Sequence, residues 1–210
     1  MIEISASAFL QLAECRTGHF CMESGFHSAL WLNLDALFAS TTRIEGFVSR
    51  LADQLRPHRL DAVCGPLLGG AFLAQRVAQL IDAEFWYTAP VAPSDGSDGS
   101  DGSDGSGLFR ARYRLPSSFA TRLSRPRIAL VDDVISAGSS LRATYSELHS
   151  ITDVVAVGAL LQLGTVGSDF FATLGIPLER VVEQSFHIWA PSDCPQCAAG
   201  MPVESVAHVV

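Results

Sequence analysis

Lysine is absent from this chain of 210 residues, and all 14 of its basic residues are arginines. Because there are 22 acidic residues, the formal net charge is −8 at pH 7, which argues against nucleic-acid binding through a basic face. No apolar run reaches the roughly 20 residues of a membrane span, so we expect no membrane partner. An anion bound by this protein must be held by arginine, by backbone N–H groups or by a metal ion.

Cysteine is also scarce, with five residues spread along the chain. An odd and scattered set excludes a disulfide scaffold and suits a reducing compartment. The N-terminal segment carries Glu3 where an export signal needs basic residues, so we expect no export and a cytoplasmic protein.

Two of these cysteines, Cys194 and Cys197, have the Cys-x-x-Cys spacing of half a zinc site. Cys15 and Cys21 would complete the site if the two ends of the chain meet. One close pair and one loose pair favour unligated cysteines over a structural zinc ion. The six histidines show no metal-ligating spacing, and surface or capping positions are expected for His19, His27 and His58.

The order of apolar segments predicts an α/β fold with a mostly parallel twisted sheet flanked by helices. Strands are expected at 61–65, 84–89, 128–131, 153–163 and 180–186, and helices at 71–81, 139–149 and 167–175. A content of 48% hydrophobic residues fits one sizeable domain with a small appendage.

The segment before this alternation predicts a small N-terminal subdomain, which we call the hood. A helix at 5–16 precedes two hairpin strands at 19–24 and 29–34, and a helix follows at 41–55. Thr42 and Glu45 have capping-box spacing at the start of that last helix. We divide the chain into a hood (1–40), a core (41–190) and a C-terminal tail (191–210).

A Ser-Asp-Gly repeat at 94–107 contains no apolar residue, so we expect a mobile loop or tether within the core. Its regularity fits either an engineered replacement of a natural loop or a natural low-complexity expansion.

Asp132 and Asp133 follow an apolar strand and precede a loop of small residues that opens a helix. In open α/β sheets, ligands bind beyond the carboxyl ends of the strands, and a helix N-terminus presents N–H groups to anions. The two carboxylates can accept hydrogen bonds from a diol, and the loop with its N–H groups can bind a phosphate. Together they suit a sugar phosphate. The alternative is a chance Asp-Asp turn at a helix N-cap.

The segment IALVDDVISAGSS resembles the phosphoribosyl-pyrophosphate (PRPP) motif of type I phosphoribosyltransferases. The resemblance implies that Asp132 and Asp133 are catalytic residues that grip the ribose hydroxyls. It also implies a loop for the 5′-phosphate, formed by Ser136, Ala137, Gly138, Ser139 and Ser140.

A second segment, VCGPLLGGAFLA, resembles the pyrophosphate loop of the same family. Glycines at the start of its helix would let the backbone approach a diphosphate closely. The resemblance implies a diphosphate site at Gly65, Pro66, Leu67, Leu68, Gly69 and Gly70. An ordinary strand-to-helix turn is the alternative.

A third segment, GHFCMESGFHSALWLNLD, resembles the hood of orotate phosphoribosyltransferases, and LGIPLERVVE resembles a later segment of that family. The resemblance implies base-binding roles for Ser24, Gly25, Phe26 and Trp31. The alternative is a hairpin that only packs on the core.

The chain departs from the orotate enzymes where they carry lysines. Glu23 stands at the place of a hood lysine, and the family's mobile loop is replaced by the repeat. Three alternating arginines would share one face of an extended strand and either contact the diphosphate or form a solvated basic edge: Arg110, Arg112 and Arg114.

The other departure concerns the base. Gln162 and Leu163 stand at the place where the family carries an arginine that pairs with the orotate carboxylate. We therefore expect poor use of orotate, unless Arg16 or Arg180 supplies the missing charge.

The resemblance implies an enzyme, a glycosyltransferase that uses PRPP and Mg²⁺ to transfer a phosphoribosyl group to a nitrogen base. It also implies a homodimer. The alternative is a regulatory protein of the same fold that binds PRPP or a nucleotide without turnover.

Overall fold

The computed structural model describes residues 3–22, 24–91, 111–120 and 124–205. The repeat at 94–107, Glu23 and Arg110 lie outside the described residues, so the expectations for them stay predictions.

Six strands form the central sheet, in the order β5-β4-β3-β6-β7-β8. Every neighbouring pair is parallel except β4 and β5, which run antiparallel at one edge. The predicted α/β fold with a mostly parallel sheet is therefore confirmed. The strands are β3 (Ala62–Pro66), β4 (Glu84–Pro90), β5 (Tyr113–Arg114), β6 (Arg127–Ile135), β7 (Asp153–Leu163) and β8 (Leu178–Gln184).

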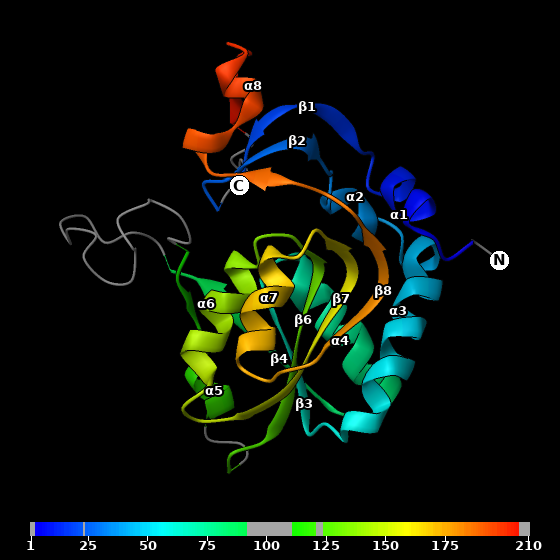
Figure 1. Cartoon of the computed structure of the whole chain (residues 1–210). Coiled ribbons are helices and arrows are strands. Elements are labelled where there is room, and N and C mark those ends of the chain that lie inside the picture. The colour runs from blue at the N-terminus through cyan, green and yellow to red at the C-terminus, as the bar shows by residue number, and fades with distance from the viewer. Residues whose placement is uncertain (1–2, 23, 92–110, 121–123, 206–210) are drawn as a thin grey trace.

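Helices cover both faces of this sheet (Figure 1). On one face Leu51 of α3 and Leu73 of α4 pack with Val131 of β6, and on the other Leu141 of α6 and Phe171 of α7 pack with Leu130. This division follows from the strand geometry, because successive residues point to opposite faces. The core helices are α3 (Thr41–Leu55), α4 (Gly69–Ile81), α5 (Ser117–Ala120), α6 (Ser139–Leu148) and α7 (Val166–Thr173), with a short 3₁₀ helix η1 (Arg56–His58).

The two hood strands, β1 and β2, form the centre of a second sheet of four strands, which we call the hood sheet, in the order β10-β1-β2-β9. Its outer strands come from the C-terminal part of the chain, so the two ends of the sequence meet there. Beyond the carboxyl end of β8 the chain continues upward to β9 of this sheet, which places the hood over the carboxyl ends of the parallel strands (Figure 1). The hood contains α1 (Ala6–Leu12), β1 (Arg16–Cys21), β2 (His27–Trp31) and α2 (Asp35–Phe38). Strand β9 (Ile188–Trp189) ends the core range, and the tail contains η2 (Pro191–Asp193), α8 (Pro195–Ala198) and β10 (Glu204–Ser205).

Two local expectations are wrong. The strand β6 does not end at Val131 but continues through the aspartates to Ile135. The cap of α3 is Ser40 rather than Thr42, and Glu45 pairs with Arg76 at 2.7 Å instead of closing a capping box. The boundaries proposed for the hood, core and tail stay predictions.

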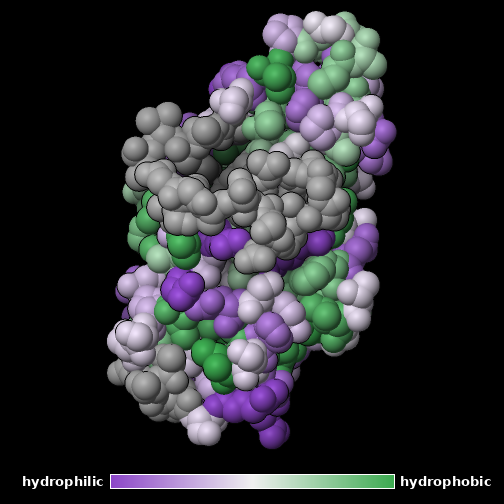
Figure 2. Space-filling model, turned by 90° about the vertical axis from the view of Figure 1, so that its left-hand side faces the viewer, coloured by the Kyte–Doolittle hydropathy of each residue, from purple (hydrophilic) through white to green (hydrophobic). Residues whose placement is uncertain are grey.

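The surface seen in Figure 2 mixes hydrophilic and hydrophobic residues over the described part of that face, and the segment around α8 stands above the rest. Among the described residues, no helix has both the length and the apolar character needed to cross a bilayer.

Candidate active site

The two aspartates of β6 are buried, with 8% and 5% of their surface exposed for Asp132 and Asp133. Because neighbours on a strand point to opposite faces, Asp132 is directed toward α6 and Asp133 toward α4. The β6–β7 ladder continues beside them, with Asp132 opposite Ala159. The aspartates are thus set into the end of the sheet and are not on a flexible turn.

Short hydrogen bonds fix both carboxylates. The Oδ2 atom of Asp132 accepts a bond from Ser140 Oγ at 2.6 Å, and its Oδ1 atom accepts one from the Asp133 N–H at 3.1 Å. Asp133 Oδ1 accepts a bond from the Val134 N–H at 2.7 Å. Burial, and then the nearby charge of Asp133, raise the pKa of Asp132 well above its usual range. A ligand that donates hydroxyl hydrogens or brings positive charge would stabilise the ionised pair.

The segment after β6 forms a tight turn at the N-terminus of α6. Gly138 caps the helix with a φ of 74°, a left-handed conformation that glycine adopts without strain. The Ser136 carbonyl accepts a bond from the Gly167 N–H at 2.8 Å, which anchors the turn to α7. Ser139 Oγ is buried and has no hydrogen-bond partner among the described residues. The turn therefore offers a hydroxyl and helix N–H groups to an anion.

The glycines that open α4 lie directly against the aspartates. A Cβ atom on Gly69 would collide with Asp133 Oδ2, and one on Gly70 would lie 2.8 Å from Asp132 Oδ1. A Cβ on Gly65 would collide with the carbonyl of Gly70. Only glycine allows this approach, so the two loops and the two carboxylates form one site.

The loop between β3 and α4 is held beside β4. The Leu67 N–H donates to the Thr88 carbonyl at 2.8 Å, and the Leu67–Leu68 peptide bond is cis. Leu68 is 55% exposed at the turn that precedes the glycines. Of the predicted diphosphate residues, Gly69 and Gly70 thus lie against the aspartates, while Gly65 packs on Gly70 and Leu67 bonds to β4.

No family model matches the chain. The orotate phosphoribosyltransferase of Caldanaerobacter subterraneus subsp. tengcongensis is 26% identical over 196 residues, which cover 93% of this chain and 91% of the relative. That of Thermotoga petrophila is 27% identical over 188 residues, 89% of this chain and 88% of the relative.

Solved structures share the fold. The orotate phosphoribosyltransferase of Aeropyrum pernix superposes with a TM-score of 0.63 at 20% identity, covering 85% of this chain and 93% of that one. The adenine phosphoribosyltransferase of Rhodothermus marinus gives 0.61 at 18% identity, covering 85% and 99%. This chain has the type I phosphoribosyltransferase fold and is a relative of the orotate phosphoribosyltransferases. The predicted resemblance is confirmed, and the relatives are enzymes of the predicted type.

Three of the four hood residues expected to bind the base lie next to one another, and the fourth lies at the opposite end of β2. Ser24, Gly25 and Phe26 form the turn between β1 and β2, where the Phe26 N–H donates to Ser24 Oγ at 3.4 Å. Trp31 lies at the other end of β2, and its ring lies 5.3 Å from the guanidinium carbon of Arg16.

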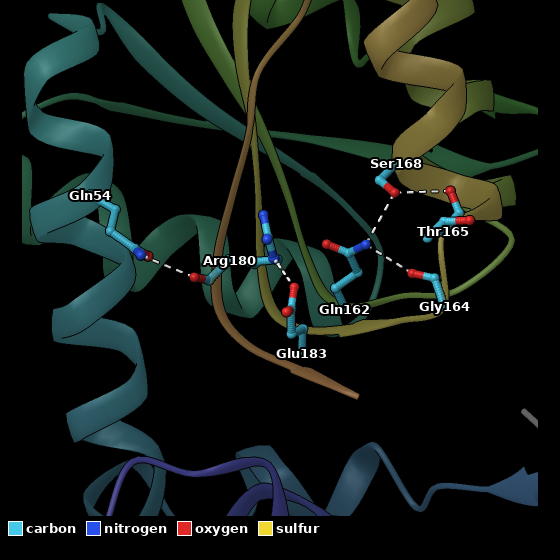
Figure 3. A network of polar contacts seen from close by, with 7 residues as sticks. All are labelled: Gln54, Gln162, Gly164, Thr165, Ser168, Arg180 and Glu183. Atoms are coloured by element: carbon cyan, nitrogen blue, oxygen red, sulfur yellow. Dashed lines mark hydrogen bonds and ion pairs between the residues drawn. The ribbon is translucent and has the colours of Figure 1, made fainter. Parts of the chain in front are cut away.

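The two residues matched to the orotate-binding arginine of the family are engaged within the protein, and Figure 3 shows the contacts of Gln162. Gln162 donates from Nε2 to the Gly164 carbonyl at 2.8 Å and to Ser168 Oγ at 3.1 Å. Leu163 is 6% exposed and packs in the core beneath α3. Neither side chain offers a cation to a carboxylate.

The two arginines that could replace it already have partners. Arg180 donates from Nε to Glu183 at 2.6 Å, and its carbonyl accepts a bond from Gln54 at 3.0 Å (Figure 3). Arg16 pairs with Glu204 at 3.0 Å in the hood. Sequence reasoning missed a hollow of about 480 Å³ between α7 and β8, with both Gln162 and Arg180 in its lining.

Two of the three alternating arginines are described, on and just before the edge strand β5. Arg114 lies 3.7 Å from Glu147 of α6, and 74% of its side chain is exposed. The Arg112 carbonyl accepts a bond from the Val91 N–H at 2.9 Å. The exposure of Arg114 on an edge strand fits the second of the two expected alternatives, a solvated basic edge and not a contact with the diphosphate.

The histidine expectation is wrong for two residues. His19 and His27 are only 4% and 7% exposed, and their ring nitrogens lie beside the thiols of Cys194 and Cys197. Cys15 and Cys21, the pair considered as partners of Cys194 and Cys197 if the two ends of the chain meet, do not belong to this group. The predicted hairpin was the one feature of the sequence that could have revealed this group. The pairing of β1 with β2, not the spacing of the residues in the sequence, brings the two histidines together. His58 is half-buried and bonds to Glu179 at 2.9 Å.

Proposed function

We propose that this protein transfers a phosphoribosyl group from PRPP to a nitrogen base. The observation that carries the proposal is the contact of Gly69 and Gly70 with the two buried aspartates, beside a helix N-terminus with an unpartnered hydroxyl. One side of the carboxylates then receives the diphosphate and the other receives the 5′-phosphate. The orotate phosphoribosyltransferase relatives support the same reaction type.

The residues around the site would position PRPP for attack at the anomeric carbon. Asp132 and Asp133 accept hydrogen bonds from the ribose hydroxyls, and the turn at Ser139 and Ser140 binds the 5′-phosphate. The base nitrogen forms a bond to the anomeric carbon while the bond to the diphosphate oxygen breaks. Positive charge develops on the sugar in this step, so the nearby carboxylates lower its free energy.

Magnesium fits the donor set of this site. Carboxylate oxygens and substrate phosphates are the ligands that Mg²⁺ prefers, and Asp132 and Asp133 are the acidic groups next to the glycine loop. The ion would neutralise charge on the leaving diphosphate. The chain has no lysine to share this task, so a cationic side chain at the diphosphate would be an arginine or a protonated histidine.

Orotate is proposed to be a poor substrate, and a neutral base a better one. Gln162 and Leu163 offer no charge to the orotate carboxylate, and Arg16 and Arg180 would each have to leave a half-exposed ion pair with a glutamate to supply it. A buried carboxylate without a paired cation is strongly disfavoured. The relatives' names favour orotate, so the specificity needs a direct test.

The test is a panel of orotate, uracil and purine bases, each incubated with PRPP and Mg²⁺ while released diphosphate is measured. We expect turnover with at least one neutral base. A specificity constant for orotate of about 10⁴ M⁻¹s⁻¹ or more would contradict the specificity proposal but not the reaction type.

A regulatory protein that binds PRPP without turnover is the second candidate, and the missing lysines favour it. Calorimetric binding of PRPP with no diphosphate release from any base would identify it. Absence of both binding and turnover would contradict the two candidates together.

A further inference from the structure

We propose that His19, His27, Cys194 and Cys197 bind one structural zinc ion that fastens the tail to the hood. Their four candidate ligand atoms all lie within 4.8 Å of one another. The two histidines come from the hairpin β1–β2, and the two cysteines flank the start of α8. The site is separate from the aspartates of β6 and does not depend on the proposed reaction.

The spacing of these atoms is that of a small tetrahedron. With Zn–N bonds of about 2.0–2.1 Å and Zn–S bonds of about 2.3 Å, tetrahedral geometry sets N···N near about 3.3 Å and N···S near about 3.5 Å. In the structure His19 Nε2 and His27 Nδ1 are 3.0 Å apart. The Cys197 thiol lies 3.2 Å from His27 Nδ1 and 3.6 Å from His19 Nε2, and the Cys194 thiol lies 3.4 Å from His19 Nε2. Small movements would place all four on one ion.

Hydrogen bonds alone do not account for this grouping. His19 Nδ1 lies 3.0 Å from the Met201 carbonyl, which can only accept, so Nδ1 carries the hydrogen and Nε2 presents a lone pair. Three groups then crowd that one lone pair: the ring of His27 and the thiols of Cys194 and Cys197. A metal ion at the centre of the group would instead bind a lone pair from each of the two ring nitrogens and the two sulfur atoms at the same time. A carbonyl that holds the far nitrogen of a ligating histidine is also the usual outer partner in metal sites.

Local features of the backbone build the site. The β1–β2 register shifts between Thr17 and Phe20, a bulge that redirects the side chain of His19. Gln196, between the two cysteines, donates from Nε2 to the Gly18 carbonyl at 2.9 Å and holds the Cys-x-x-Cys turn against the bulge. The Cys194 carbonyl accepts a bond from the Ala198 N–H at 3.1 Å, which closes the turn.

Apart from the two-residue pairing of β10 with β1, few contacts hold the tail in place. Of residues 191–205, Cys194 alone is buried, and the segment around α8 projects from the molecule in both views (Figure 1, Figure 2). A segment without an apolar core gains its fixed structure from a cross-link such as a metal ion. The Arg16–Glu204 pair is half-exposed and contributes little. The zinc ion would therefore order the tail and the β1–β2 turn with Ser24 and Gly25.

The ligand set points to zinc. Two thiolates and two imidazoles in a tetrahedron are typical of structural zinc sites, and four protein ligands leave no open position for catalysis.

The test measures bound zinc in the full-length protein after purification with zinc and dialysis without chelator. We expect about one zinc ion per chain in the wild type and almost none in Cys197→Ser. Cys197 is exposed, so this substitution removes a ligand without disturbing packing. The matched control is Cys21→Ser. Cys21 lies on the hairpin that carries the two histidines but is outside the four-residue group, so this variant should keep its zinc.

Two further readouts are independent of catalytic activity. Cobalt(II) in place of zinc should give the visible absorption of tetrahedral thiolate coordination in the wild type and lose it in Cys197→Ser. Removing the metal should speed amide hydrogen exchange in residues 191–205 and leave β6 and β7 unchanged. Three outcomes would overturn the proposal. The wild type could contain no zinc although its thiols are reduced, it could contain iron in place of zinc, or Cys197→Ser could keep all of its zinc.

Discussion

Replacement of Asp132 by asparagine should stabilise the free protein, and replacement of both buried aspartates should weaken its ligand binding. The geometry of Asp132 tolerates the change. An asparagine oxygen can accept the bond from the Asp133 N–H, and the Ser140 hydroxyl can rotate to accept a bond from the new amide. The substitution therefore removes charge without removing a hydrogen-bond partner.

The effect on stability follows from the pKa of Asp132, which burial and Asp133 raise. The folded state holds this proton more tightly than the unfolded state does. The contribution of Asp132 to wild-type stability is therefore fully present below the ordinary aspartate pKa of about 4 and is lost as the pH rises through the higher folded value. Asp132→Asn lacks this loss, so its melting temperature should exceed that of the wild type at pH 7 and the difference should vanish in acid.

Ligand binding should change in the opposite direction. A hydrogen bond to a carboxylate contributes about 1.5–3 kcal/mol, and one to a neutral amide about 0.5–1.5 kcal/mol. The double variant Asp132→Asn with Asp133→Asn should lose about 2–3 kcal/mol of ribose 5-phosphate binding, roughly 30- to 150-fold in Kd. Calorimetric titration of ribose 5-phosphate into both proteins gives this ratio.

The control is Asp153→Asn. This aspartate starts β7 at the opposite end of the sheet, is half-exposed and lies 3.6 Å from Arg127. Its replacement should leave ribose 5-phosphate binding unchanged and alter stability by at most about 1 kcal/mol. Equal affinities for the wild type and the double variant would refute the assignment of the aspartates, and a lower melting temperature of Asp132→Asn at pH 7 would refute the electrostatic reasoning.

Two other predictions concern the glycine loop and assembly. Gly70→Ala places a Cβ 2.6 Å from Pro66 and 2.8 Å from Asp132, so calorimetry should show at least tenfold weaker ribose 5-phosphate binding, about 1.4 kcal/mol. The control is Gly46→Ala, whose Cβ would meet only Ile4 at 3.8 Å; it should raise stability by about 0.5–1 kcal/mol and leave binding unchanged. Unchanged binding in Gly70→Ala together with weakened binding in Gly46→Ala would contradict the argument that the glycine backbone approaches the aspartates closely. We also propose a homodimer, for which light scattering should give twice the 22.4 kDa mass of the chain; a monomer at micromolar concentration would count against it.

The sequence was sufficient for the order of the core elements because their apolar patterns are long and regular. The helix at 41–55 and the strand at 153–163 have the predicted bounds, and the carboxylates and glycines were recognisable from their motifs. The end of β6 was misjudged, because two adjacent charges look like the end of a strand. Their burial depends on the glycines of α4 and on Ser140, which are distant or on another element.

The group of histidines and cysteines was not predictable from spacing. His19 and Cys194 are 175 positions apart, and their approach depends on β9 and β10 joining the hood sheet. These strands have two residues each, too short for an alternating pattern to reveal them. The role of Gln162 was hidden for a different reason, since its partners Gly164 and Ser168 are near in the sequence but only the turn into α7 brings them to its side chain.

The hood sheet makes the first-synthesised strands depend on the last. Strands β1 and β2 leave the ribosome before any strand of the central sheet, yet both of their outer neighbours come from residues 188–205. All six strands of the central sheet lie between them in the sequence, so that sheet can assemble while the hairpin still has two open edges. A nascent chain that stalls before residue 188 would expose those edges beside a finished core, which makes the late stage of translation the period of greatest exposure to misassembly.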